Sequence, residues 1–99
     1  MGFNRPSFRT GQNGIAVSGV AEQCTAAEVP QGIRAVFRSR STNAGILYIG
    51  YSKADAELNN FGIVPTGSVA LLVDNVSDVW VDATSADDIV EWMYEVPIE

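Results

Sequence analysis

The chain has 99 residues, of which 46% are hydrophobic and 18% are charged, and its formal net charge at pH 7 is −6. This length suits one globular domain, and the hydrophobic share is too high for a wholly disordered chain. Histidine is absent and cysteine occurs once, which excludes an intrachain disulfide, a Cys/His zinc site and a catalytic group that depends on a histidine base.

The charges are divided unevenly along the sequence. The segment up to Lys53 carries all six cations and only two acids, Glu22 and Glu28, for a net charge of +4, whereas the remainder carries ten acids and no cation. This asymmetry favours head-to-tail contacts between copies of the chain, binding of a basic arm to an acidic partner, or pairing of the two halves within one domain. The negative overall sign disfavours binding to nucleic acid.

Residues 1–13 predict an extended, irregular N-terminal arm, because Pro6, Gly11 and several small polar residues interrupt every periodicity. The arm contains four candidate partner-binding residues, Phe3, Arg5, Phe8 and Arg9. The phenylalanines either fold back onto the domain or anchor the arm in a groove of a neighbouring molecule. No apolar run typical of a signal peptide or a transmembrane helix occurs, so we expect folding in a cytoplasm and no membrane partner.

Residues 14–99 predict a single β domain. In chain order we expect a strand over 15–20, a weaker extended piece over 22–28, a turn over 29–32 and a strand over 33–40 that places Ala35 and Phe37 on one face. A hairpin-type loop over 41–45 follows, in which Gly45 is available for a positive φ, and then a strand over 46–51 that is apolar on both faces. Cys24 is expected to be a small core residue.

The remaining elements are also mostly short strands. Residues 52–60 predict one helical turn or a long loop, residues 61–65 return the chain to the sheet, and residues 66–67 form a turn. Strands over 68–73 and 76–82 meet at Asp74–Asn75, a polar loop spans 83–88, and a last strand over 89–96 directs Val90, Trp92, Tyr94 and Val96 inward before Pro97 ends its pairing. About seven short antiparallel strands without an amphipathic helix predict an all-β fold, a small antiparallel β-sandwich or barrel.

Acidic residues provide the only candidate small-ligand sites. The loop from Asp82 to Asp88 is the best candidate for calcium, but it lacks the spacing of an EF-hand, so we expect solvated turn acids and no metal. Asp78 and Asp82 flank Trp80 and can hold a sugar, as in carbohydrate-binding modules, or they point to solvent and leave Trp80 as a partly exposed interface residue. No phosphate-binding motif occurs, and we expect no cofactor, no catalytic residue and no enzymatic activity.

Three arginines, Arg34, Arg38 and Arg40, share one face of the strand predicted over 33–40. They are further candidate partner-binding residues. We expect them either to pair with Glu91 and Glu95 on a neighbouring strand or to meet the acidic half of another copy.

Four stretches of the sequence carry a family resemblance: residues 41–50 (STNAGILYIG), 62–67 (GIVPTG), 71–83 (LLVDNVSDVWVDA) and 90–95 (VEWMYE). Through them residues 33–95 resemble a small β-domain of virion structural proteins of tailed bacteriophages, of the capsid decoration or cement type. The matching positions are turns and core residues, and the arm over residues 1–13 has no counterpart in the pattern.

The resemblance implies a protein that is assembled in the host cytoplasm, binds the major capsid protein on the outer surface of the capsid and stabilises the head. It also implies a homo-oligomer, with a trimer favoured. The alternative within the same family is another virion component, such as a head fibre, neck, tail or baseplate protein. A carbohydrate-binding module that uses Trp80 is the second alternative.

Overall fold

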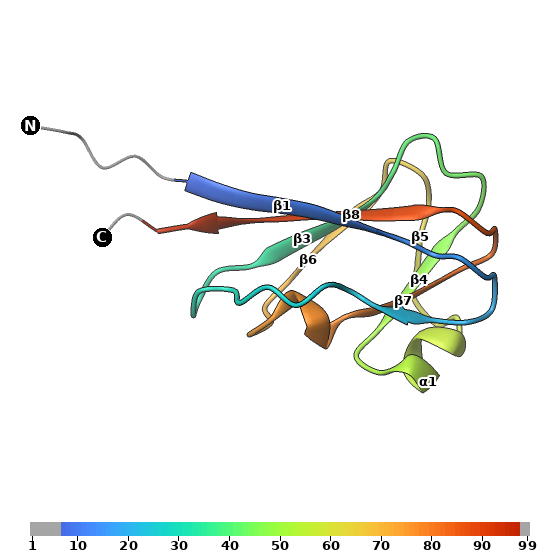
Figure 1. The fold of residues 1–99 in the computed structure, drawn as a ribbon, viewed down its shortest axis with the longest axis horizontal. Helices are drawn as coiled ribbons and strands as arrows, with labels where there is room; N and C mark the ends of the chain where they lie inside the picture. Colours follow the sequence, from blue (N-terminus) through green and yellow to red (C-terminus); the bar gives the residue numbers. More distant parts are fainter. Residues whose placement is uncertain (1–6, 98–99) are drawn as a thin grey trace, which may run out of the picture.

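The computed structural model describes residues 7–97, which form two four-stranded antiparallel sheets packed face to face (Figure 1). The long sheet has the order β1-β8-β3-β6 and contains β1 (Ser7–Gly14), β8 (Ile89–Val96), β3 (Ala35–Ser39) and β6 (Ser68–Leu71). The short sheet has the order β2-β7-β4-β5 and contains β2 (Glu22–Gln23), β7 (Trp80–Ala83), β4 (Leu47–Gly50) and β5 (Gly62–Ile63). A short helix, α1 (Lys53–Glu57), follows β4, and a 3₁₀ turn, η1 (Val76–Asp78), precedes β7.

The core lies between the two sheets. Phe37 and Val90 of the long sheet and Leu47 and Val81 of the short sheet are fully buried and belong to one contiguous apolar cluster. Removal of these side chains from water is the main stabilising contribution in a fold of this kind. The predicted all-β antiparallel fold is therefore confirmed as a two-layer arrangement, with eight strands in the described residues where about seven were expected.

The alternation predicted for the two central strands of the long sheet is also confirmed. In β8 the buried positions include Val90, Trp92 and Tyr94, and in β3 they are Ala35, Phe37 and Ser39. Trp92 and Tyr94 stack with ring centroids 6.1 Å apart, which places two large aromatic rings over the inner face of the sheet. The opposite residues of both strands form the outer face of the long sheet.

The expected irregular arm is the largest correction. Residues 7–14 are extended, but they form β1 and pair along their whole length with β8, from Ser7↔Val96 to Gly14↔Ile89. The strand crosses the expected boundary between arm and domain at residue 13. The prediction failed because it rested on local side-chain composition. The backbone groups of β1 form hydrogen bonds with the eight-residue edge of β8, and these bonds do not depend on which side chains β1 carries. Residues 1–6, which include the predicted contact residues Phe3 and Arg5, lie outside the described part of the chain.

Three smaller expectations are wrong. Residues 15–20 form a connection, not a strand, because the chain must cross there from the long sheet to the short sheet, with Gly19 at φ +86°. The strand expected over 76–82 is divided into η1 and β7, because the Asn75 side chain caps the 3₁₀ turn. Gly45 is not at a positive φ; glycine is needed there because a Cβ would lie 2.1 Å from Thr84 Oγ1.

Candidate interaction surfaces

The outer face of the long sheet carries a small ion-pair network. Arg38 on β3 donates to Glu91 on β8 through Nε (3.0 Å) and Nη2 (2.8 Å), and Arg40 Nε donates to the other carboxylate oxygen of Glu91 at 3.1 Å. Arg40 also donates to Gln12 on β1, so three strands are joined. The hydrogen bond from Arg38 and, to a smaller extent, the charge and hydrogen bond of Arg40 hold the pKa of Glu91 below its ordinary value, against the opposing effect of desolvation.

Two of the three arginines predicted to share this face form ion pairs in the structure. Arg38 and Arg40 pair with Glu91 of the same chain, which agrees with the predicted alternative of pairing with a neighbouring strand. Arg34 is exposed at the start of the same face, and neither it nor Glu95 makes an ion pair with any of the described residues. Surface pairs of this kind contribute little to stability, and their main effect is to fix the orientation of charge on the face.

An apolar stripe crosses the same face between the charged positions. The register aligns Met93, Val36 and Ala70 on β8, β3 and β6, and the polar Thr10 on β1 ends the row. Met93 is 40% exposed. A shallow hollow of about 370 Å³, lined by Gly11, Val36 and Met93 among others, lies beside Arg38 and Glu91. Apolar residues surrounded by charged ones are the usual composition of a protein–protein interface.

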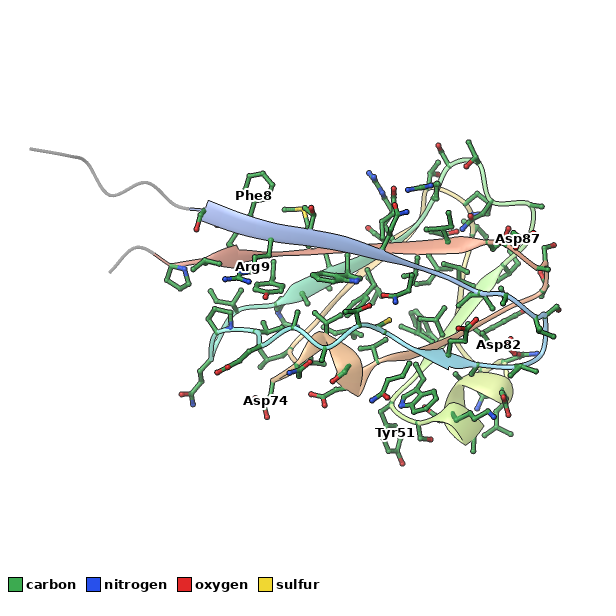
Figure 2. All side chains as sticks on the ribbon, in the orientation of Figure 1. Phe8, Arg9, Tyr51, Asp74, Asp82 and Asp87 are labelled. Atoms are coloured by element: carbon green, nitrogen blue, oxygen red, sulfur yellow. The ribbon has the colours of Figure 1, made fainter. Side chains whose placement is uncertain are left out.

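The β1 edge presents two of the predicted contact residues. Phe8 is 64% exposed on the outer face, and Arg9 points to the opposite side of the strand, toward Tyr94 and a hollow lined by Glu28 and Pro30. Figure 2 shows these two side chains on opposite sides of β1 near its beginning. Because β3 pairs with β8 only as far as Val36↔Met93, the residues around Phe8 belong to a two-stranded ribbon that extends past β3.

A second surface lies on the open side of the sandwich, between β6 and β4. An apolar groove of about 390 Å³ is lined there by Val69, Leu71, Leu72, Ile49, Tyr51 and Phe61 together with a single acid, Asp78. Three of these side chains, Leu72, Phe61 and Tyr51, are more than half exposed, and Figure 2 shows Tyr51 pointing away from the body of the molecule. The groove has no signature in the sequence, because its two walls are far apart in the chain.

Trp80 does not lie between two solvent-facing acids. Asp82 is buried and its Oδ1 accepts hydrogen bonds from the backbone N–H groups of Gly19 (2.9 Å) and Ala83 (2.7 Å). Asp78 is exposed, and its carboxylate accepts a bond from the Asn75 N–H as part of the cap of η1. The expectation that acids of this strand point to solvent is wrong for Asp82, and the proposed sugar site loses one of its two carboxylates to the fold.

The loop considered for calcium also uses its acid internally. Asp88 is buried and accepts hydrogen bonds from the N–H groups of Ala44 and Gly45, both at 2.9 Å. Within residues 7–97, no three metal-ligating side chains are grouped closely enough to hold an ion. Both buried aspartates therefore connect loops, a role that the sequence alone did not indicate.

Cys24 is the core residue that the sequence predicted. Burial raises the pKa of its thiol to about 12, so at neutral pH it is protonated and a poor nucleophile.

The longest run of α-helix in the described residues is α1, with five residues, and no helix of that region has the length and apolar character needed to cross a bilayer.

Comparison of this chain with protein-family models, with curated proteins and with solved structures gave no match.

Proposed function

We propose that this protein is a non-enzymatic structural protein of a tailed-bacteriophage virion, a decoration protein that binds the major capsid protein on the outer capsid surface and stabilises the head. The proposal starts from the resemblance of residues 33–95 to such proteins. The observation that carries it is the outer face of the long sheet, where the apolar stripe around Met93 and Val36 lies between charged positions.

This face suits attachment to a large, repetitive surface. A four-stranded sheet with a packed core behind it is stiff, so little conformational entropy is lost when the face is covered. One such face is small, but a homo-oligomer presents several copies to a capsid lattice, and multivalent attachment raises the overall affinity without new contacts. The proposed location is the virion surface, reached from the host cytoplasm, with protein as the only partner and no contact with nucleic acid or membrane.

The test mixes the purified protein with undecorated capsids and measures co-sedimentation and the temperature at which the capsids open. We expect saturable binding at micromolar protein, with hundreds of copies per particle, and opening at a higher temperature. Saturation at a few copies would assign the protein to the alternative, a head fibre, neck, tail or baseplate component. No co-sedimentation at micromolar protein would contradict the decoration proposal.

A matched pair of variants locates the binding face. Met93→Glu places a charge in the apolar stripe and should weaken capsid binding about tenfold or more, as expected for a contact near the centre of an interface. Val17→Glu changes a more exposed apolar residue in the β1–β2 connection and should leave binding unchanged. Equal effects of the two substitutions would exclude the outer face as the binding surface.

A further inference from the structure

Both edges of the long sheet expose backbone groups that no strand of the described chain satisfies. On the β1 side, Ile15 donates to the Asp88 carbonyl (2.9 Å) and accepts from the Asp87 N–H (2.7 Å), so Ile15 bonds toward β8. Because the direction of these groups alternates along a strand, the N–H and C=O groups of Phe8, Thr10 and Gln12 point away from the sheet.

The β6 edge shows the same arrangement. Ser39 donates to the Gly67 carbonyl and accepts from the Thr66 N–H, both at 2.9 Å, so the bonds between β3 and β6 continue through Val69 and Leu71. The backbone groups of Ser68, Ala70 and Leu72 then point outward. Since successive strands of the long sheet are antiparallel, β1 of a second molecule placed beside β6 continues the alternation of strand directions.

We propose that β1 of one copy pairs antiparallel with β6 of the next copy, with Phe8 opposite Leu72, Thr10 opposite Ala70 and Gln12 opposite Ser68. In this register outward-pointing backbone groups meet outward-pointing backbone groups. The side chains of Phe8, Thr10, Gln12, Ser68 and Ala70 lie on the outer face, and Leu72, the residue after β6, lies at the rim of the adjoining groove, so the outer faces of the two copies become continuous.

Exposed apolar side chains at the two edges match in this register. Phe8 is 64% exposed at one edge and Leu72 is 61% exposed at the other. Phe8 pairs with Glu95, and Leu72 follows Leu71, the last residue of β6 that pairs with β3. Extending the registers of β3 beyond their last pairs, Val36↔Met93 and Ala35↔Leu71, would put Phe8 and Leu72 in one row. Joining the edges makes Phe8 and Leu72 cross-strand neighbours, and each covers the other's exposed surface.

Charge complementarity identifies the occupant of the apolar groove as a second copy of this chain. Arg9 lies between Phe8 and Thr10 and points to the inner face, so in the proposed register it is opposite Leu71, at the groove between β6 and β4. Its aliphatic stem covers the apolar wall, and its guanidinium reaches the groove's single acid, Asp78. The contact is head-to-tail, so it closes into a ring or continues as a filament.

The assembly is tested without any capsid, so its outcome is independent of the proposed function. Thr10→Pro and Ala70→Pro each remove an outward N–H while leaving the bonds to β8 and to β3 in place. We expect the wild type to be a closed ring of several copies or a filament. Each variant alone should be a monomer by light scattering, and a mixture of the two should form a one-to-one heterodimer, because each retains the edge that the other lacks.

A second pair of variants keeps the proposal testable if a proline prevents folding. Phe8→Glu and Leu72→Lys should each abolish assembly, and the double variant should restore it, whereas Val17→Lys, at an exposed site away from both edges, should assemble like the wild type. A monomeric wild type at high micromolar concentration would overturn the proposal. So would an Ala70→Pro variant that still dimerises, since that result requires β1 to pair with β1.

Discussion

At the level of single residues, Gly11 shows how β1 depends on the side chains behind it. The indole of Trp92 lies across this glycine, and a Cβ there would be 2.2 Å from Trp92 Cζ2. Trp92 also donates from Nε1 to Asn13 Oδ1 at 3.2 Å, so the ring is held against β1 by packing and by a hydrogen bond. The absence of a side chain at residue 11 is therefore a requirement of core packing.

Gly11→Ala should lower the free energy of unfolding by about 1–3 kcal/mol, because the indole must move from its packed position. Near-UV circular dichroism of Trp92 should change at the same time. Gly14→Ala is the matched control on the same strand: no atom lies within 4 Å of its added Cβ, and we expect a change within about 0.5 kcal/mol. Equal losses in the two variants, measured by urea unfolding, would contradict this account.

The ion pair of Glu91 makes the stability of the fold depend on pH. Its pKa is lowered in the folded protein, chiefly by the hydrogen bond from Arg38, so the pair stabilises the fold only while the carboxyl is ionised. The contribution is fully present above the pKa of an unfolded glutamate, about 4.3, and is lost as the pH falls through the lower folded value. Because the pair is at the surface, the effect should be below about 1 kcal/mol.

This is checked by comparing the wild type with Glu91→Gln. The stability difference between them should be present at pH 7 and should shrink toward zero as the solution is acidified below the folded pKa. Glu95→Gln, on the same face but without an ion pair among the described residues, should show no such convergence. A difference between the wild type and Glu91→Gln that is constant with pH would contradict the assignment.

At the level of elements, the buried aspartates join loops from distant parts of the chain. Asp88, in the loop between β7 and β8, holds the N–H groups of Ala44 and Gly45 in the loop between β3 and β4. Asp82, in β7, holds the Gly19 N–H of the β1–β2 connection. These bonds satisfy backbone donors at the ends of strands, where the sheet ladders no longer can.

Asp88→Ala should therefore destabilise the protein by about 1–3 kcal/mol, because two partly buried backbone donors lose their acceptor. The exposed neighbour offers a control: Asp87→Asn keeps a residue type that tolerates its φ of +68°, and should change stability by less than about 0.5 kcal/mol. Urea unfolding of both variants decides the comparison. If Asp88→Ala were as stable as Asp87→Asn, the loop-joining role of this carboxylate would be wrong.

At the level of the whole molecule, Cys24 reports on global opening. It is buried in the cluster shared by both sheets, and burial raises the pKa of its thiol to about 12. We expect the native protein at pH 8 to resist thiol reagents, with a labelling rate that rises in urea in proportion to the unfolded fraction.

The control moves the thiol by two residues. Cys24→Ala/Ala26→Cys places it at an exposed position of the same segment, and labelling should then be fast in the folded state. Comparable labelling rates for the two proteins under native conditions would show that the sheets separate locally at Cys24.

Several elements followed from the sequence because their evidence is local. The alternation in β3 and β8 identified the buried positions Phe37, Val90 and Trp92, since side chains in a strand alternate between two faces with a period of two. The turns around Gly32 and Thr66 followed from turn composition, and the structure places both residues at positive φ. The single helical turn at α1 and the pairing of Arg38 and Arg40 with Glu91 were likewise among the predicted alternatives.

What the sequence by itself determined is thus the class of the fold and the burial pattern of its central strands. Tertiary structure alone decided that residues 7–14 join the sheet, that Asp82 and Asp88 turn inward, and that an apolar groove lies between β6 and β4. The physical reason is the same in each case. Edge pairing, loop-spanning hydrogen bonds and surface grooves depend on backbone groups and on residues brought together from distant positions. None of these three features leaves a periodic signal in the sequence.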